Sequence, residues 1–365
     1  MVAIVAGLLP GISNRAVVKA GKLLRGHHET PSTELIEAFR IAHAWRDAHA
    51  LPMRRIRQEV ARKARQVDPA AVTPGRMKRM KSIRKKLRRQ AWDLLQIQDI
   101  GGCRAIASGP TELSEILRHF KEGCRHELVA EHDHISFPKL DGYRSHHLVL
   151  RYRPSDGDGP ETAQLIEVQL RTRLQHAWAT AVEAVGLVRG EDLKGGGGSA
   201  EWLRLFALMG TELSLEEGFA AVPGTPLCAR ERRHEMRGLE GRLDAIANLD
   251  SFRRIIDRTS AAQASPGQVF LIQYDNSNMT VSAKPFSSLA AGAQSYEAAE
   301  RGGAVDTVLV ELDRAADLRQ AYPNYYLDVG LFTKRLARML PEPQAAKVRF
   351  DWIDRWKARS RGVKP

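Results

Sequence analysis

The chain has 365 residues, enough for two domains with cores of their own, and its 43% hydrophobic and 27% charged residues are typical of a globular protein. No segment approaches eighteen consecutive apolar residues, and the short apolar start lacks the basic residues of a signal peptide, so we expect no membrane partner. The three cysteines show neither metal-ligand nor disulfide spacing, which predicts a reducing, cytoplasmic location.

The positive charge of the chain is concentrated in one region. Residues 54–89 contain fifteen Lys and Arg residues against Glu59 and Asp68, a net charge of +13, which equals the net charge of the whole chain. A basic region of this density predicts a polyanionic partner such as nucleotide phosphates, RNA or DNA. The alternative for part of the run is a solvated helix face that serves solubility.

The first 69 residues predict a helical, basic N-terminal region. Ser32, Thr33 and Glu34 follow a proline and form a start signal for a helix. A basic helix is expected over residues 52–66, and the Pro and Gly residues between 69 and 75 break it.

A second basic helix is predicted over residues 76–95. Its apolar positions fall on one face and its cations on the other. Lys78, Ser82 and Lys86 have the spacing i, i+4, i+8, which on a helix would align two ammonium groups and a hydroxyl. Cations placed in this way can bind successive phosphates of one triphosphate, or they can point to water.

The next segment alternates strands and helices. Asp99 precedes a predicted strand that ends near residue 106, and an amphipathic helix is expected over residues 111–122. His132, Asp133 and His134 invite a metal-site interpretation. We do not favour it, because adjacent strand residues point to opposite faces and cannot converge on one ion.

The strand over residues 165–172 pairs in a predicted hairpin with the strand over 148–153, across a turn at 155–160. Ile166, Val168 and Leu170 can enter a core while the alternating polar residues face a cleft. An antiparallel strand with one solvated face is the simpler alternative. A helix follows over residues 174–188.

The rest of the chain has a different pattern of predicted elements. Residues 194–199 form a glycine-rich loop that lacks the Lys-Ser/Thr of a P-loop, and residues 200–262 are mostly helical. A hairpin over 269–283 turned at 275–278, a helix at 296–300, a strand at 305–312 and a final helix from 328 follow. We predict an α+β protein with a core domain over 70–220, a helical connector over 221–262 and a small α/β domain over 263–365.

Four stretches in chain order resemble the synthetase domain of the RelA/SpoT family. The pattern R-x-K-x-x-x-S-I-x-x-K matches residues 76–86, and D-x-x-x-x-R matches residues 99–104. The pattern P-K-x-N-G-Y-x-S-x-H matches residues 138–147, and E-I-Q-I-R-T matches residues 167–172, followed by matching residues at 176 and 178–179. The resemblance covers residues 70–220 and implies a mixed β-sheet flanked by helices, like that of nucleotidyltransferases.

The resemblance also implies an activity. These enzymes transfer pyrophosphate from ATP to the 3′-hydroxyl of a guanine nucleotide, in a Mg²⁺-dependent GTP diphosphokinase reaction that makes the alarmones of the stringent response. Asp99 would bind Mg²⁺, and Glu167 would be a second ligand or the general base. Matching residues for the ATP phosphates are Arg76, Lys78, Ser82, Lys86 and Arg104. Matching residues for the acceptor are Lys139, Asp141, Tyr143 and His147, supported by Gln169, Arg171 and His176.

Two departures from the family pattern bear on the acceptor. Asp141 stands where the family has asparagine, and His146 replaces an aliphatic residue. Because only about 75 residues precede Arg76, no accompanying hydrolase domain fits there, and we expect a short, synthetase-only member.

Two alternative functions stay open. One is a toxin that pyrophosphorylates the tRNA 3′ end or an adenine nucleotide, with tRNA on the basic region and an antitoxin as partner. The other is a non-catalytic nucleotide-binding protein. Association into a homo-oligomer is left open as well.

Overall fold

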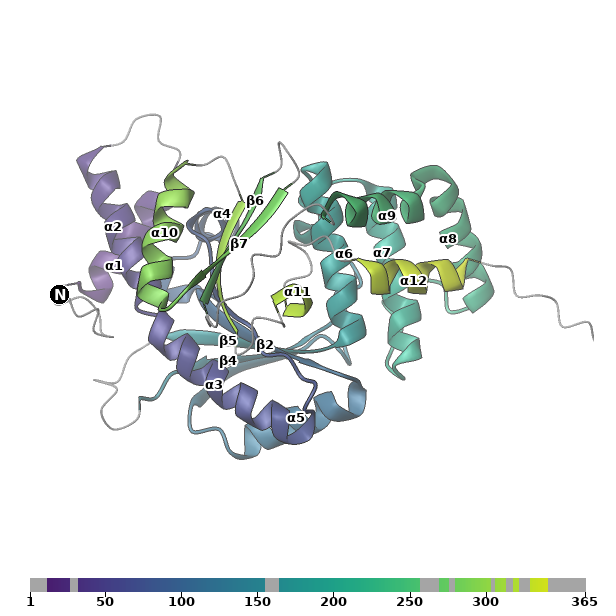
Figure 1. Ribbon diagram of the computed structural model, residues 1–365, viewed down its shortest axis with the longest axis horizontal. Coiled ribbons are helices and arrows are strands. Elements are labelled where there is room, and N and C mark those ends of the chain that lie inside the picture. Colours follow the sequence, from purple (N-terminus) through teal and green to yellow (C-terminus); the bar gives the residue numbers. More distant parts are fainter. Residues whose placement is uncertain are drawn as a thin grey trace, which may run out of the picture.

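The computed structural model describes residues 12–26, 32–154, 164–256, 269–275, 280–302, 306–312, 318–321 and 329–340 (Figure 1). The apolar start, the turn predicted at 155–160 and most of the turn at 275–278 lie outside these ranges. No helix within them is long and apolar enough to cross a membrane.

An 8-stranded mixed sheet forms the centre of the described molecule. Its order is β3-β4-β5-β2-β1-β8-β6-β7. Strands β2 and β5 are parallel, and the other neighbouring pairs are antiparallel. The predicted α+β class is therefore confirmed. The strands are β1 (Gly75–Met77), β2 (Gly101–Ala107), β3 (Glu127–Asp133), β4 (His146–Arg151), β5 (Leu165–Thr172), β6 (Val269–Asp275), β7 (Thr280–Phe286) and β8 (Asp306–Glu311).

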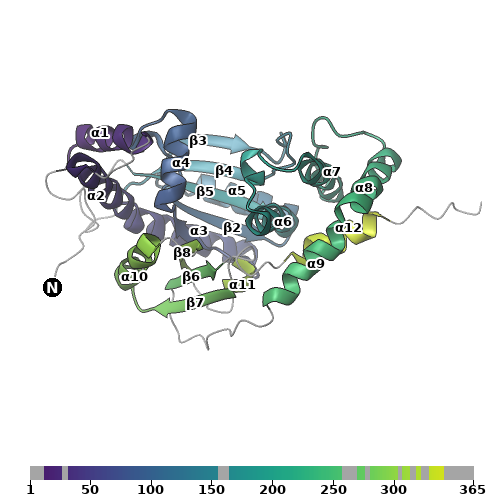
Figure 2. The ribbon, with the colours of Figure 1, turned by 90° about the horizontal axis from the view of Figure 1, so that it is seen from above.

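Helices cover both faces of this sheet (Figures 1 and 2). Helices α3 (Ala50–Val67) and α5 (Pro110–Glu122) pack against β2 and β5 on one face, and α6 (Arg173–Arg189) stands on the other. The remaining helices are α1 (Asn14–Arg25), α2 (Thr33–Asp47), α4 (Met80–Gln90), α7 (Ala200–Glu216), α8 (Ala229–Leu243), α9 (Ala245–Ile256), α10 (Leu289–Gly302), α11 (Leu318–Ala321) and α12 (Gly330–Met339), with 3₁₀ turns η1 (Leu94–Gln96) and η2 (Leu193–Gly195).

The alternation predicted for β5 is present. Ile166, Val168 and Leu170 are fully buried in a core shared with α3 and α5. A second core lies on the α6 side, where Trp202 and Phe206 of α7 pack in one cluster with residues of β6 and β8. The sheet therefore separates two apolar layers.

The helix predicted over residues 76–95 is wrong at both ends. Arg76 lies in β1, paired with Gly102 of β2 and Val310 of β8, and the helix begins only at Met80. It ends at Gln90, because Ala91 adopts a left-handed conformation with φ 53°. Strand pairing outweighs the helical periodicity here, so Lys78 does not share a helical line with Ser82.

Strands β6, β7 and β8, expected in a small C-terminal α/β domain, extend the same sheet. Gly75 of β1 pairs with Glu311 of β8, and β8 pairs in turn with β6. The boundaries assigned to the domains stay predictions. The continuous sheet brings residues near position 310 beside the strand that carries Arg76.

Candidate active site

A cavity of about 240 Å³ lies on the α6 side of the sheet, above β1, β2 and β5. Most of the residues predicted for the site line it. They are Arg76, Lys78, Asp99, Arg104, Lys139, Asp141, Tyr143, His147, Glu167, Gln169 and Arg171. The four stretches singled out in the sequence therefore meet in one place.

Strand register explains why these side chains share a face. Gly102 of β2 lies opposite Glu167 of β5, and Arg104 lies opposite Gln169. Paired residues on neighbouring strands point the same way, so the polar positions of β5 and Arg104 of β2 face the cavity together. The alternate residues of both strands enter the core beneath.

Two lysines hold Asp99 at one end of the cavity. Lys78 Nζ lies 2.6 Å from Asp99 Oδ2, and Lys86 Nζ lies 2.9 Å from Oδ1. Burial alone would raise the pKa of Asp99, but the two ammonium groups hold it far below its usual range. Burial lowers the pKa of Lys78, although Asp99 opposes this effect. Two donors on one carboxylate favour a charged cluster at neutral pH.

Glu167 is the second carboxylate of the cavity. Its Oε1 lies 2.9 Å from His147 Nδ1, and its Oε2 accepts a 2.6 Å hydrogen bond from Gln169 Nε2. Burial raises the pKa of Glu167, but these hydrogen bonds outweigh burial and bring it to about 2. The pKa of His147 is lowered, chiefly by burial. Glu167 is thus an ionised acceptor at neutral pH.

The contacts of Glu167 close into a ring of five side chains. Arg171 Nη2 donates to Tyr143 Oη over 2.6 Å and to Gln169 Oε1 over 2.8 Å, and Tyr143 Oη lies 2.7 Å from His147 Nε2. Arginine can only donate, so the Tyr143 hydroxyl accepts from Arg171 and donates to Nε2 of a neutral His147. The Nδ1–H of that histidine then donates to Glu167. Every member has a partner on both sides, which orients the carboxylate.

Tyr143 is placed by a tight turn. Gly142 has φ +93°, and a Cβ there would lie 3.0 Å from both Trp178 Cζ2 and the Phe206 carbonyl oxygen. The Lys139 ammonium and the Arg171 guanidinium each lie 5.1 Å from the centre of the Tyr143 ring. A flat aromatic surface beside cations suits a nucleotide base and its phosphates.

Asp141 serves this turn directly. Its Oδ1 accepts a 2.9 Å hydrogen bond from the Tyr143 backbone N–H, as an asparagine oxygen would. The side chain also lines the cavity. The departure from the family asparagine therefore preserves the turn, and a role in reading the acceptor base stays a prediction.

Three predicted residues do not line the cavity. Lys86 forms an ion pair with Asp99, which does line the cavity. Ser82 is half-buried on α4 and is not among the lining residues. His176 is buried, with Nε2 3.3 Å from the Gln320 carbonyl oxygen, and burial keeps its pKa well below the usual value. The roles predicted for Ser82 and His176 thus lack a direct path to a ligand in this cavity.

Two charged residues of the cavity were not predicted. Glu183 of α6 and Lys194 of η2 line it, with Lys194 Nζ 2.7 Å from Glu183 Oε1. Burial raises the pKa of Glu183, but Lys194 and Arg104 hold it far below its usual range. Glu183 lies four residues after Ala179 on α6, and Ala179 also lines the cavity, so this i, i+4 spacing was the available signal. Nothing in the glycine-rich loop pointed to Lys194.

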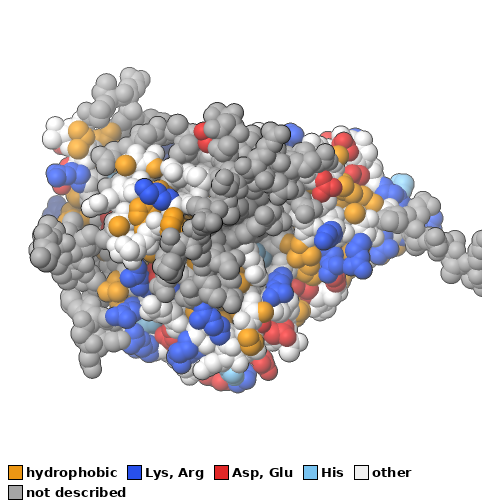
Figure 3. Space-filling model, viewed as in Figure 1, with side chains coloured by type: hydrophobic (Ala, Val, Ile, Leu, Met, Phe, Trp, Pro, Cys, Tyr) orange, Lys and Arg blue, Asp and Glu red, His pale blue; other side chains and the backbone are white. Residues whose placement is uncertain are grey.

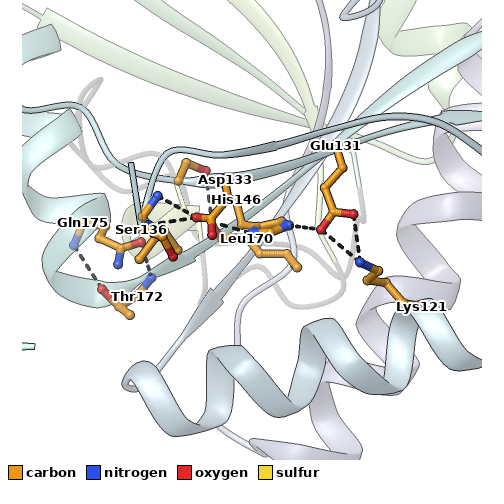
Figure 4. Close-up of polar contacts among 10 residues, drawn as sticks. Lys121, Glu131, Asp133, Ser136, His146, Leu170, Thr172 and Gln175 are labelled. Atoms are coloured by element: carbon orange, nitrogen blue, oxygen red, sulfur yellow. Dashed lines mark hydrogen bonds and ion pairs between the residues drawn. The ribbon is translucent and has the colours of Figure 1, made fainter. Parts of the chain in front are cut away.

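His146, the other departure from the family pattern, belongs to the opposite face of β4 (Figure 4). Its Nε2 lies 2.7 Å from Glu131 Oε1, and Lys121 of α5 donates to the same carboxylate over 2.8 Å. Asp133 accepts from the Ser136 backbone N–H. His146 therefore supports the back of the sheet rather than the acceptor side of the cavity.

The carboxylates fit a magnesium ion by their chemistry. Across the described ranges, no group of three or more His, Cys, Asp or Glu residues is arranged to hold a metal. Mg²⁺, however, commonly takes one or two carboxylates together with substrate phosphates. Asp99 and Glu167, ionised and in one cavity, would supply two such carboxylates.

Comparison with known proteins gives a consistent result. A family model described as "Region found in RelA / SpoT proteins" matches residues 75–186. The chain is similar to GTP pyrophosphokinase YjbM of Bacillus subtilis (strain 168), with 33% identity over 115 residues, 31% of this chain and 54% of the relative. It is also similar to GTP pyrophosphokinase YwaC of that organism, with 29% identity over 119 residues, 31% of this chain and 56% of the relative.

Among solved structures, one match is the small alarmone synthetase 1 of Bacillus subtilis bound to its product pppGpp. The two chains are 32% identical, the match covers 30% of this chain and 58% of that chain, and the TM-score is 0.28. The chain spans about half the length of the curated relatives it matches. The family match covers the strands and the turn at Tyr143 that line the cavity, whereas η2 and α7, which also line it, lie outside the match. Residues 75–186 of this chain are therefore similar to the region found in RelA and SpoT proteins.

Proposed function

We propose that the protein transfers the β,γ-pyrophosphoryl group of ATP to the 3′-hydroxyl of a guanine nucleotide, GDP or GTP, releasing AMP and forming an alarmone of the (p)ppGpp type. One observation carries the proposal: two ionised carboxylates, Asp99 in the turn before β2 and Glu167 on the neighbouring strand β5, share a cavity, with cations beside Asp99 and with Tyr143 linked to Glu167 through His147. The names of the relatives, GTP pyrophosphokinases, support the same reaction.

In this proposal the donor binds beside Asp99. Lys78 and Lys86 are held in place by Asp99, and Arg76 and Arg104 line the same cavity. Charge-assisted hydrogen bonds from these side chains would position the ATP phosphates for in-line attack. Mg²⁺ would be held by Asp99 and Glu167 and would neutralise charge on the phosphates.

The acceptor would lie on the Tyr143 side. Its base would stack on the Tyr143 ring, Lys139 would bind its phosphates, and its 3′-hydroxyl would donate a hydrogen bond to Glu167. A carboxylate with a pKa of about 2 is a weak base. Phosphoryl transfer depends mainly on positioning and charge, so we assign Glu167 to orienting the hydroxyl and holding the ion.

The test is a product assay on the purified chain. The protein is incubated with MgCl₂, ATP labelled in the pyrophosphoryl group, and GDP, GTP, ADP or bulk tRNA in separate reactions. We expect labelled product with GDP or GTP. Label that enters only tRNA or only ADP would reject the guanine acceptor in favour of the toxin alternative.

The position of the basic helix favours a nucleotide over tRNA. Arg55, Arg62 and Arg65 are exposed on α3, which covers the face of the sheet opposite α6 and the cavity. Figure 3 shows lysine and arginine side chains on the surface where α3 and α5 lie. Other cations of the run act internally: Arg57 is buried against Glu311, and Lys63 binds Glu59. A tRNA bound along α3 would therefore lie on the face of the sheet opposite the cavity.

A further inference from the structure

The strand that carries Arg76 depends on the C-terminal part of the chain. Strand β1 has only 3 residues and lies between β2 and β8. Without β8 it would be a sheet edge, and short edge strands have few hydrogen bonds to hold them. Gly75 pairs with Glu311 and Arg76 with Val310, so β8 fixes β1 from the side away from β2.

A buried ion cluster ties β8 to the start of this strand. Glu311, with a side chain 2% exposed, lies 3.1 Å from Arg54 Nε and 3.4 Å from Arg57 Nη2. Arg57 in turn donates to the Thr73 carbonyl oxygen over 3.2 Å. A Cβ at Gly75 would lie 2.8 Å from Arg57 Cδ, so the arginine packs directly under β1. Glu311 is thus linked through Arg57 to the backbone of Thr73, two residues before β1.

A second connection reaches the other end of β1. The Arg46 guanidinium lies 4.6 Å from the centre of the Tyr296 ring on α10. Arg46 Nε donates to the Lys78 carbonyl oxygen over 2.8 Å. Arg46 and Tyr296 are both buried, so the contact is shielded from water. Residues 73–78 are therefore held at both ends by arginines that contact the C-terminal segment, Arg57 through Glu311 and Arg46 through Tyr296.

We propose that Glu311 and Tyr296 are positioning residues for the nucleoside triphosphate site, and that β6–β8 with α10 serve to hold Arg76 and Lys78 in place. The identity of the ligand rests on the proposed function. The acceptor side of the cavity is built from β4, β5 and the turn at Tyr143, with β2 between it and β1. Loss of either contact should therefore loosen the donor side and leave the acceptor side unchanged.

The first test does not depend on any ligand. Hydrogen–deuterium exchange is measured on the full chain for wild type, Glu311→Gln and Tyr296→Leu. We expect the amides of residues 75–79 to exchange at least about tenfold faster in both variants, because each change removes the partner of a buried arginine that contacts this segment. Amides of β4 and β5 should be unaffected.

Two controls separate positioning from general destabilisation. Glu311→Asp keeps the carboxylate and should retain most of the protection. Val308→Ala removes an equally buried side chain from the same strand, one that packs in the core with Phe270 and Ile272, and should not change exchange in residues 75–79. If Glu311→Gln does not fold, Tyr296→Leu decides the outcome.

The second test measures binding by calorimetry with a non-hydrolysable ATP analogue, MgCl₂ and, separately, GDP. Displacement of Arg76 and Lys78 should weaken binding of the analogue about 10- to 100-fold in Glu311→Gln and Tyr296→Leu, with GDP binding unchanged. The proposal would be overturned if Glu311→Gln and Tyr296→Leu kept the exchange rates and the analogue affinity of the wild type. It would also be overturned if Val308→Ala changed both quantities as much as they did. A wild-type chain that binds no ATP analogue would refute the proposed function, while the exchange data would still decide the positioning role.

Discussion

Replacing Glu167 by glutamine tests the ring of hydrogen bonds at its most informative position. The carboxylate accepts from both His147 and Gln169. An amide has one acceptor oxygen, so in the variant its NH₂ group must face either the Nδ1–H of His147 or the NH₂ of Gln169. One hydrogen bond of the ring is lost, together with the charge that we propose for holding Mg²⁺.

If Glu167 orients the acceptor as proposed, the expected loss of turnover is about 10²–10³-fold, the range for removal of one preorganised electrostatic contact at the reacting groups. One unsatisfied buried hydrogen bond should lower the free energy of unfolding by about 1–3 kcal/mol, which leaves the fold intact. Product formation from labelled ATP and GDP measures the first quantity, and urea unfolding measures the second.

Glu131→Gln is the matched control. Glu131 also bonds a histidine, His146 over 2.7 Å, but on the opposite face of the sheet. This variant should retain activity. Near wild-type turnover by Glu167→Gln, or an equal loss in Glu131→Gln, would refute the role assigned to the ring.

The remaining predictions concern the two halves of the cavity and pH. Lys78→Ala and Lys86→Ala should raise the KM for ATP, whereas Tyr143→Ala should chiefly raise the KM for the acceptor. Steady-state kinetics with each substrate varied in turn test this, and an increase in the KM for ATP alone in all three variants would contradict it. Asp141→Asn should keep wild-type thermal stability, because its oxygen can still accept from the Tyr143 N–H; assays on GDP, ADP and tRNA report whether the acceptor preference changes. The pKa of Glu167, about 2 against an ordinary 4.5, gives stability that is present above pH 4.5 and lost as the pH falls towards 2. The stability difference between wild type and Glu167→Gln, followed by urea unfolding, should therefore shrink over that window.

Local sequence patterns predicted the cavity well. The alternation in β5 places Glu167, Gln169 and Arg171 on one face without knowledge of the rest of the fold, and these residues do line the cavity. Such a period-2 pattern depends only on strand geometry and one buried face. The stretch that carries Tyr143 was found differently, through its resemblance to the family pattern over residues 138–147.

Long-range partners were the part that sequence could not supply. Arg76 lies in a strand because β8, more than 200 residues later in the chain, pairs with it, whereas its own neighbours have a helical pattern. Arg57 and Lys63 counted as surface charge by composition, yet both side chains are buried with partners. Tertiary pairing decides such positions, and a local window does not contain it.

The most direct test of the account compares GDP with 3′-deoxy-GDP as acceptors for ATP labelled at the β-phosphate, in the presence of MgCl₂. Transfer of the intact pyrophosphoryl group to a 3′-hydroxyl predicts labelled product from GDP, with one AMP released per product, and no product from the 3′-deoxy analogue. Labelled product from 3′-deoxy-GDP, or ADP in place of AMP, would contradict the proposed reaction.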